Sequence, residues 1–386
     1  MASPSRDASP SSGDATVNPY AQAGVDTAAG DLAVELMKSA VRRTHGPEVL
    51  GGVGGFAGLF DASALRGYER PLLATSTDGV GTKVAIAQAI DKHDTIGIDL
   101  VGMVVDDIVV VGAKPLFMTD YIACGKLYPE RIAAIVGGIA EGCAQTGTAL
   151  VGGETAEHPG LLGLNDYDVA GAATGVVEAG AILGADRVED GDVVLALASS
   201  GLHSNGYSLV RHIVAGAGIQ YGDNAADLGG TWGEALLEPT RLYTTPLLRL
   251  IEALPGQVHA LSHVTGGGIA ANLARVLPQG TWVDVDRSTW SPAPVFRVLA
   301  DLGHLDLGAT EGTWNLGIGF LAVVSAGSAD AAIAALAGEG ITTWQVGAVR
   351  TGAIPDDGNG AFEQGAKGVD GGAVRLVGTY NTGGAV

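Results

Sequence analysis

Apolar strands alternate with helices along both halves of the chain, and this alternation limits the folds that the chain can adopt. In the first half, strands are predicted at 70–77, 115–124, 148–160 and 166–179, and helices at 26–44, 93–112 and 129–147. In the second half, a strand, a polar loop and a helix are predicted within 193–216, and a loop that opens a helix is predicted within 263–278. Further helices are predicted at 240–254, 292–302 and 328–337, and strands at 258–262, 282–286, 315–324, 342–350 and 373–380. Mixed helices and strands in both halves predict layers of the α/β or α+β class. Neither half has a strict strand–helix–strand repeat, and no clear strand precedes the glycines at 51–55, so a dinucleotide-binding fold is not favoured.

The length of 386 residues predicts two domains, because a single hydrophobic core rarely grows beyond about 250–300 residues. The composition changes at 179–192, and we place the boundary there. The predicted units are a first domain at 20–184 and a second domain at 185–386. Residues 1–19 are rich in Ser, Pro, Ala and Asp and predict a disordered tail. A flexible insert is predicted at 353–372, before the last strand.

The charge of the chain excludes several kinds of partner. It has 42 acidic and 21 basic residues and a formal net charge of −21. Binding to nucleic acid rests on Lys and Arg that neutralise phosphates, so we expect no nucleic-acid partner and no anionic membrane surface. The sequence has no apolar run long enough to span a membrane, and Cys124 and Cys143 match no disulfide or zinc pattern. The N-terminus lacks the apolar stretch of a secretory signal, and we therefore expect a cytoplasmic protein.

Carboxylates occur where the surrounding sequence is apolar. The set is Asp78, Asp99, Asp106, Asp107, Asp120 and Glu154. On the predicted helix, Asp99 and Asp106 fall within about 20° of each other around the axis, and Asp107 lies about 80° from Asp99. An unpaired buried carboxylate is strongly disfavoured, so these acids need partners or a metal ion. Together they predict an oxygen cage for Mg²⁺. An exposed helix face with ordinary helix caps would give a similar pattern.

The segment "STDGVGTK" places Asp78 directly before a glycine-rich turn. Gly79 and Gly81 would let the backbone approach an anion closely, and Thr82 and Lys83 can donate hydrogen bonds to phosphate oxygens. A Mg²⁺ ion on Asp78 would remove the repulsion between carboxylate and phosphate. The alternative is a tight turn from strand to helix that binds nothing.

Two further polar turns precede predicted helices in the second half. In "GLHSNGYS", Ser204 and Asn205 are candidate donors or caps, and in "HVTGGG" the backbone N–H groups at the helix start suit an anion. A capped helix start without a ligand explains both turns equally well. His203 and His263 lie at these turns. A lone histidine is more often structural, but two beside candidate anion sites are candidates for proton transfer.

At this point a family resemblance is visible. The segments that carry it are "YAQAGVD", "GPEVLGGVGGFAGLF", "STDGVGTK", "HDTIGIDLVGM", "VGGETAEHPG", "GLHSNGYSLVR" and "HVTGGGIAANLARVLP". Their order and spacing closely resemble the phosphoribosylformylglycinamidine cyclo-ligases, or AIR synthetases, from Tyr20 to Arg350. FGAM synthetase, selenophosphate synthetase and thiamine-monophosphate kinase share the fold and the acidic ATP site, but "GGETAEHPG" is more similar to the cyclo-ligases.

The resemblance implies a fold, a reaction and an assembly. The fold is two α/β domains, and the N-terminal domains of two subunits pair into a barrel-like sheet in a homodimer. The reaction converts ATP and formylglycinamidine ribonucleotide (FGAM) into aminoimidazole ribonucleotide (AIR), ADP and phosphate, a step of de novo purine synthesis that uses Mg²⁺. The formyl oxygen is phosphorylated, and an amidine nitrogen then closes the ring.

The resemblance also implies roles for the residues that match the family's motifs. The metal ligands are Asp78, Asp107 and Glu154; ATP contacts are Gly79, Gly81, Thr82, Lys83 and Asp120; contacts with the substrate and its ribose phosphate are Ser204, Asn205, Thr265, Gly266, Gly267 and Gly268; catalytic candidates are His203, His263 and Lys83. The chain departs from the family at Asp106, where many members have Asn. It also has Ala309 and Gly312 in place of an acid and an arginine, and we assign neither residue a role.

Two other functions remain open at the level of sequence. A related ATP-dependent small-molecule kinase would share the acidic half of the chain without needing both polar turns, and assays of acceptor molecules would separate it. A non-catalytic metal-binding protein would bind Mg²⁺ and turn over no ATP with any substrate.

Overall fold

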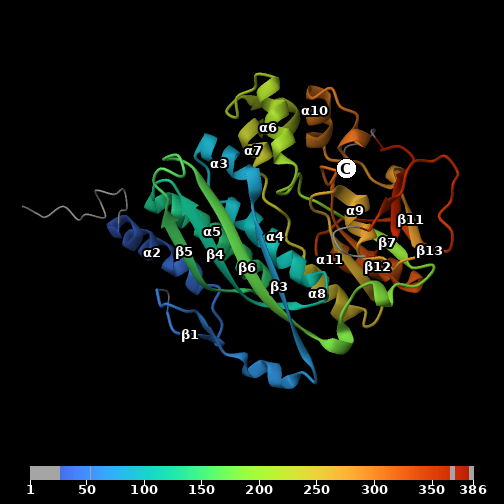
Figure 1. The fold of residues 1–386 in the computed structure, drawn as a ribbon, viewed down its shortest axis with the longest axis horizontal. Helices are drawn as coiled ribbons and strands as arrows, with labels where there is room; N and C mark the ends of the chain where they lie inside the picture. The colour runs from blue at the N-terminus through green and yellow to red at the C-terminus, as the bar shows by residue number, and fades with distance from the viewer. Residues whose placement is uncertain (1–26, 53, 366–369, 382–386) are drawn as a thin grey trace, which may run out of the picture.

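The computed structural model describes residues 27–52, 54–365 and 370–381 (Figure 1). The tail predicted at 1–19 lies outside the described residues. Most predicted helices and strands are confirmed, with ends that differ by a few residues. Short elements that the sequence did not predict are α3 (Val84–Ile90), α7 (Trp232–Leu236), β1 (Val49–Leu50), β2 (Leu59–Phe60), β8 (Asn224–Ala225), β9 (Gly230–Thr231) and β14 (Glu363–Gln364).

The first half of the chain forms a four-stranded sheet with helices on one face. In spatial order its strands are β3 (Pro71–Gly79), β6 (Tyr167–Glu178), β4 (Lys114–Cys124) and β5 (Ala149–Glu157). β4 and β5 are parallel and are joined by α5 (Pro129–Thr146), whereas the other neighbours are antiparallel. Helices α4 (Ile96–Val109) and α5 pack on the sheet, and α2 (Thr27–Arg42) packs on α5.

Glycines allow α4 and α5 to pack closely. A Cβ atom on Gly97 would lie 2.0 Å from the backbone nitrogen of Ile139, and one on Gly138 would lie 2.4 Å from the carbonyl oxygen of Asp94. No larger residue fits at either position without moving a helix. Pro129 opens α5 at its first turn, as predicted, and Gly147 ends it in the left-handed conformation.

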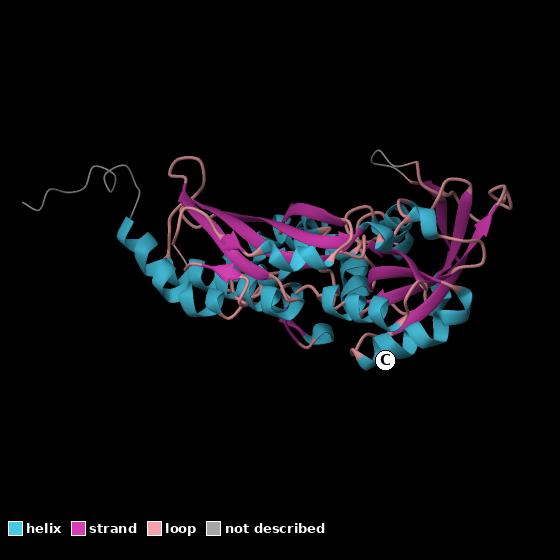
Figure 2. Cartoon of the chain, turned by 90° about the horizontal axis from the view of Figure 1, so that it is seen from below, coloured by secondary structure: helices cyan, strands magenta, loops and turns pink. Residues whose placement is uncertain are grey.

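Within the described residues, no helix packs on the other face of this sheet (Figure 2). Successive residues of a strand point to opposite faces, and the side chains that point away from α4 and α5 are exposed. Leu73 of β3 is 63% exposed and Tyr121 of β4 is 42% exposed. The edge strands of this sheet are β3 and β5. We call this surface the open face.

The second half forms a seven-stranded mixed sheet that is covered on both faces. In spatial order its strands are β10 (Val258–His263), β12 (Ile318–Val324), β7 (Val193–Ala198), β13 (Thr343–Thr351), β11 (Thr281–Asp286), β15 (Ala373–Val377) and β14. Only β11 and β15 are parallel neighbours. Helices α8 (Thr244–Ala253) and α11 (Ala329–Gly338) contribute to the core on one face, and α9 (Gly268–Ala274) contributes on the other. This explains why β7 and β12 are continuous apolar runs rather than alternating ones.

The hydrophobic core of the first sheet extends beyond the predicted domain boundary at 184/185. Helices α6 (Tyr207–Gly216), α7 and α10 (Pro294–Leu302) contribute buried side chains to it. Tyr207, Trp232, Phe296 and Trp314 belong to the same cluster as Ile86 and Leu100. The boundary itself stays a prediction.

Part of the predicted insert at 353–372 is tied to the second sheet. Arg375 of β15 is almost completely buried and binds the carboxylates of Asp284 and Asp357. The guanidinium group also lies 4.5 Å from the centre of the Phe362 ring. These contacts fix the described portion of the segment around Asp357 and Phe362, and the flexibility of the insert stays a prediction. Among the described residues, no helix is both long enough and apolar enough to cross a membrane.

Candidate active site

Two adjoining recesses lie between the first sheet and the loops of the second half. The first, which we call the acidic recess, is lined by Asp78, Gly79, Val80, Gly81, Met103, Asp168, Ser204, Asn205, Thr265 and Gly266. The second, which we call the arginine recess, is lined by Thr75, Ser76, Asp107, Val110, Ser262, His263, Thr265, Asn272, Arg275 and Val276. Their volumes are about 450 and 290 Å³. Thr265 lines both, so the two recesses are neighbours, and we call the pair the cleft.

The glycine-rich turn places Asp78 at the end of β3, as predicted. Its carboxylate accepts a hydrogen bond of 2.7 Å from the backbone N–H of Gly79, and the residue is exposed. Gly81 has a φ of 72°, a conformation that favours glycine. Asp168 of β6 brings a second carboxylate to the same recess. The turn therefore presents two acids, with backbone groups of Gly79 and Gly81 beside them.

Lys83 points into the core instead of toward the recess. Its ammonium group is fully buried and donates to Oδ1 of Asp99 at 2.8 Å and to the carbonyl oxygen of Glu238 at 2.7 Å. Burial lowers the pKa of Lys83 and raises that of Asp99, while the charge of each partner opposes the shift. Thr82 does lie at the turn's surface, where its hydroxyl is 3.3 Å from that of Ser208. In this arrangement Lys83 links the two halves of the chain, and its contact with phosphate stays a prediction.

The buried acids of α4 have protein partners. Asp99 accepts hydrogen bonds from the backbone N–H and the hydroxyl of Thr240. Asp106 accepts from the backbone N–H groups of Tyr243 and Thr244 and from the Thr244 hydroxyl. Burial raises the pKa of Asp106 to about 6, although these hydrogen bonds and the nearby His263 oppose the rise. Lys83 and residues 240–244 thus supply partners for both acids, and the Oδ2 atom of Asp99 is buried without a partner among the described residues.

Asp107, one residue further along α4, lies in the arginine recess and pairs with His263. Its carboxylate is 2.9 Å from Nδ1 of His263. Burial alone would lower the pKa of His263, but the hydrogen bond and charge of Asp107, together with Asp106 and Asp78, raise it above the usual value. The imidazole stacks on the ring of Phe320, which fixes its plane. His263 is therefore held at the wall of the cleft by both contacts.

His203 lines neither recess and is enclosed by protein. Its Nε2 atom accepts a hydrogen bond from the backbone N–H of Ser200, and its Nδ1 atom is buried without a partner among the described residues. Burial holds its pKa well below the usual value. Its φ of 60° lies in the left-handed region. These features favour a structural role, which the sequence left open.

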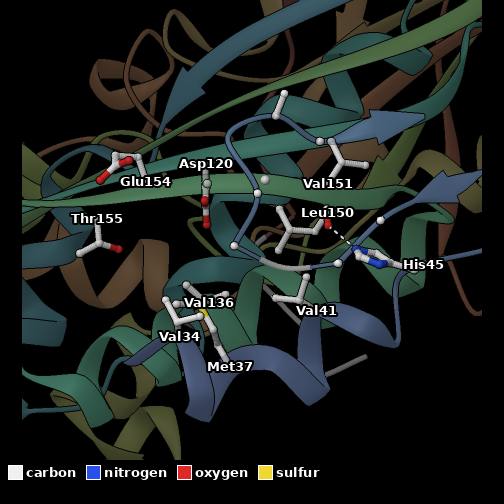
Figure 3. Close-up of a pocket in the computed structure, with 18 of the residues that line it drawn as sticks. Val34, Met37, Val41, His45, Asp120, Val136, Leu150, Val151, Glu154 and Thr155 are labelled. Carbon is white, nitrogen blue, oxygen red and sulfur yellow. Dashed lines mark hydrogen bonds between the residues drawn. The ribbon is translucent and has the colours of Figure 1, made fainter. Parts of the chain in front are cut away.

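Asp120 and Glu154 line a third cavity, whose lining includes neither Asp78 nor Asp107 (Figure 3). This cavity, of about 270 Å³, lies between α2, the glycine-rich loop at 51–58 and strands β4 and β5. Figure 3 shows Asp120 pointing into it, opposite apolar side chains of α2 such as Val34 and Met37. Burial raises the pKa of Asp120 to about 7, and its Oδ2 atom has no hydrogen-bond partner among the described residues.

Sheet register explains why Glu154 lies apart from Asp78. Asp78 pairs with Gly171, and Gly171 pairs on its other side with Asp120, so these residues share one row and one face of the sheet. Glu154 pairs with Tyr121 and therefore belongs to the opposite face, on the far edge strand. Within the described residues, no group of three Asp, Glu, His or Cys side chains gathers closely enough to hold a metal ion.

The glycines before α9 differ in position. Gly266 lines the acidic recess, whereas Gly267 and Gly268 are absent from the lining of both recesses. A Cβ atom on Gly268 would lie 1.6 Å from the carbonyl oxygen of Glu311. Gly267 and Gly268 have φ values of 105° and 73°. Close packing and backbone conformation therefore explain these two glycines without a ligand.

The cleft also contains residues that sequence reasoning missed. Asp168 occupies an exposed position in the alternating pattern of β6, where an acid is ordinary and gave no distinctive signal. Arg275 follows the glycine turn by one helix length, but an arginine at a helix end is common and gave no distinctive pattern. Thr75 and Ser76 are ordinary strand residues until the fold places them at the cleft.

Comparison with known proteins shows the class of fold. Residues 60–177 match the family described as AIR synthase related protein, N-terminal domain, and residues 189–354 match the corresponding C-terminal domain. A thiamine-monophosphate kinase from Stenotrophomonas maltophilia has a similar structure, with a TM-score of 0.61, 19% identity, and coverage of 88% of this chain and 95% of that one. A hydrogenase maturation protein HypE in complex with ATP has a TM-score of 0.56, 20% identity, and coverage of 84% and 87%. These likenesses show the fold, that of the AIR synthase related proteins.

Relatives with higher sequence identity define the family within this class of proteins. A phosphoribosylformylglycinamidine cyclo-ligase of Synechocystis is 48% identical over 344 residues, which cover 89% of this chain and 98% of the relative. Cyclo-ligases of Thermosynechococcus vestitus and Sorangium cellulosum are 49% and 50% identical, over 86% of this chain and 97% and 94% of their own lengths. The chain belongs to the phosphoribosylformylglycinamidine cyclo-ligase family.

Proposed function

We infer that the protein is a ligase that converts FGAM and ATP into AIR, ADP and phosphate in purine biosynthesis. One observation carries this inference: identity of 48–50% with named cyclo-ligases extends over 94–98% of their lengths. The structure adds a polar cleft between the two sheets, with carboxylates at one end and a guanidinium group at the other.

The reaction needs an activated oxygen and a closed site. The formyl oxygen attacks the γ-phosphorus of ATP, and the bond from that phosphorus to ADP breaks. An amidine nitrogen then attacks the activated carbon, the phosphate leaves with the former formyl oxygen, and the nitrogen loses a proton. The protein has to hold both substrates in line and stabilise the transferred charge. His263, oriented by Asp107 and Phe320, is our candidate to accept the proton.

The acidic recess fits a magnesium ion. Mg²⁺ is usually held by one or two carboxylates together with phosphate oxygens of the substrate. Asp78 and Asp168 supply two carboxylates in this recess, which Gly79 and Gly81 also line. When bound there, Mg²⁺ would neutralise charge on the transferred phosphoryl group. Asp107 and Glu154 remain proposed ligands, but within one chain they lie in other recesses.

We propose that the third cavity accepts the nucleoside part of ATP. Apolar side chains of α2 and the backbone of several glycines form its wall. The Oδ2 atom of Asp120 has no hydrogen-bond partner among the described residues. A largely apolar cavity with one precisely placed polar group is typical of small-molecule sites. Gly79 ends β3 of the same first sheet, and Gly81 and Thr82 follow it in the turn. Gly79 and Gly81 line the acidic recess, where the phosphates would be needed.

Substituting Asp120 with leucine tests this assignment. We expect the KM for ATP to rise about tenfold, as for loss of one hydrogen bond to a charged group, while the KM for FGAM stays within about twofold. Because the folded-state pKa of about 7 is above the ordinary value, the ionised form is penalised by folding. The melting temperature of the variant should therefore increase relative to that of the wild type as the pH rises from about 4 to about 7. An unchanged KM for ATP would contradict the assignment.

The substrate is expected in the cleft itself. Ser204, Asn205, Thr265 and Gly266 line the acidic recess and offer hydroxyl, amide and backbone groups. We propose that they contact the FGAM molecule near its reacting end. Gly267 and Gly268 support this wall through backbone conformation.

We also propose that two copies associate through the open face. The open face exposes Leu73 and Tyr121, whereas the opposite face of the same sheet is covered by helices. Apolar side chains on an uncovered sheet face favour association with a second surface. Two such sheets facing each other would give the barrel-like dimer that the resemblance implies. Sedimentation of the purified chain would test this proposal.

A coupled ADP-release assay tests the function. With ATP, Mg²⁺ and FGAM, we expect ADP and AIR in equal amounts, and chelation of the metal with EDTA should abolish both. The same protein should release no ADP with thiamine monophosphate as the acceptor. Turnover of that acceptor without AIR formation would favour the kinase alternative, and ATP turnover with neither would favour a binding protein.

A further inference from the structure

Arg275 is a cation without an acidic partner in a strongly acidic protein. It follows the last turn of α9, is exposed, and lines the arginine recess. Its Nη1 atom lies 3.3 Å from Oδ1 of Asn272. Among the ion pairs of the described residues, none includes Arg275, although Arg287 and Arg375 each bind carboxylates. The guanidinium group is therefore available to an anion.

Asn272 connects Arg275 to the junction of the two recesses. This side chain is 3% exposed. Its Oδ1 atom accepts from Arg275 and from the Thr265 hydroxyl, and its amide group donates to the carbonyl oxygens of Thr265 and Gly268. One buried asparagine thus holds the arginine and the threonine on the same wall. Asn272 is a positioning residue for both.

The cleft has opposite charge at its two ends. The acidic recess is lined by Asp78 and Asp168 and by no lysine or arginine. The arginine recess contains Arg275 as its one Lys or Arg side chain, and its Asp107 is already paired with His263. Lys83, the other cation near the turn, is committed to Asp99 in the core. A doubly charged anion entering this cleft would find Arg275 as its main cationic partner.

On the basis of the proposed function, we propose that Arg275 binds the phosphate group of FGAM. FGAM carries a phosphate monoester on one side of its ribose, and the basic amidine followed by the formyl group on the other side. The charges of the cleft match that order when the phosphate lies in the arginine recess and the amidine faces Asp78 and Asp168. Guanidinium groups bind phosphate in paired, charge-assisted hydrogen bonds. Thr75 and Ser76 line the arginine recess, and Thr265 lines both recesses.

This placement refines the expectation from sequence, which put the ribose phosphate at Ser204, Asn205 and the glycines before α9. In the refined arrangement, Ser204 and Asn205 lie beside the reacting end of the substrate. The formyl oxygen is then next to the recess that holds Asp78, where phosphoryl transfer takes place. Arg275 therefore sets the direction in which the substrate lies.

The test is the variant Arg275→Gln, which keeps a polar side chain and removes the charge. We expect the KM for FGAM to rise about 10- to 100-fold and the KM for ATP to change less than about twofold. Arg275→Lys should recover part of the loss, because it restores the charge without the paired geometry. The matched control is Arg211→Gln, on the exposed surface of α6 and outside both recesses.

A binding measurement separates this proposal from the proposed function. Ribose 5-phosphate carries the phosphate and the sugar but cannot react, and its affinity can be measured by calorimetry without ATP. We expect a loss of affinity in Arg275→Gln that is absent from the control. Unchanged affinity for ribose 5-phosphate, or an equal rise in the KM for ATP, would overturn the role of Arg275. Failure of the wild type to form AIR, with ribose 5-phosphate binding still dependent on Arg275, would instead count against the reaction alone.

Discussion

The variant Asp78→Asn is expected to lose activity by roughly 100-fold or more while it stays folded. Asparagine keeps the shape of the side chain but removes the charge that would hold Mg²⁺ beside the phosphates, and loss of one group that stabilises transferred charge costs about 100- to 1,000-fold in kcat. Asp78 is exposed at the end of β3, so we expect the substitution to cost little stability. The measurement is kcat with saturating ATP and FGAM, together with the melting temperature.

The matched control is Asp227→Asn, an exposed acid away from the recesses. It should leave kcat and melting temperature unchanged. Raising the Mg²⁺ concentration should restore little of the lost rate in Asp78→Asn. Near-normal kcat at saturating Mg²⁺ would show that Asp78 is not a metal ligand.

The second large effect is expected for Lys83, and on stability rather than on chemistry. Lys83→Met removes one partner of a fully buried ion pair and leaves Asp99 with the hydrogen bonds of Thr240 alone. Breaking a buried pair in this way costs about 3–5 kcal/mol of the free energy of unfolding. Denaturation in urea, followed by circular dichroism, would measure the loss.

The double variant Lys83→Met, Asp99→Leu distinguishes this explanation from a catalytic role. Replacing both charges removes the unpaired carboxylate, so the double variant should recover part of the stability that Lys83→Met loses. If Lys83 instead contacts phosphate in the reaction, Lys83→Met would keep its stability and lose kcat. That result would contradict the buried pair as the main role of this lysine.

Local patterns in the sequence predicted most of the helices and strands because their causes are local. Pro129 and Gly147 mark the ends of α5 by their own backbone preferences. The apolar runs of β7 and β12 predict strands covered on both faces. By contrast, which face of a strand an acid occupies depends on the register between strands. The sequence alone therefore could not predict that Asp78 and Glu154 lie apart.

The buried acids show a similar limit. Apolar surroundings correctly predicted that Asp99 and Asp106 need partners, but the partners are Lys83 and residues 240–244, more than a hundred positions away for the latter. The periodicity of α4 contains no information about that distant segment. For the same reason, Arg275 and Asp168 became candidates only when the fold placed them at the cleft.

The shared hydrophobic core has a consequence for the separate halves of the chain. Trp232, Phe296 and Trp314 pack into the cluster that contains Leu100 of α4. A fragment that ends at residue 184 would expose the apolar surface that these side chains cover, and we expect it to aggregate rather than to fold alone. The intact chain should accordingly lose both sheets in a single cooperative step. Genes that encode the two halves separately would work only if the products assembled during folding.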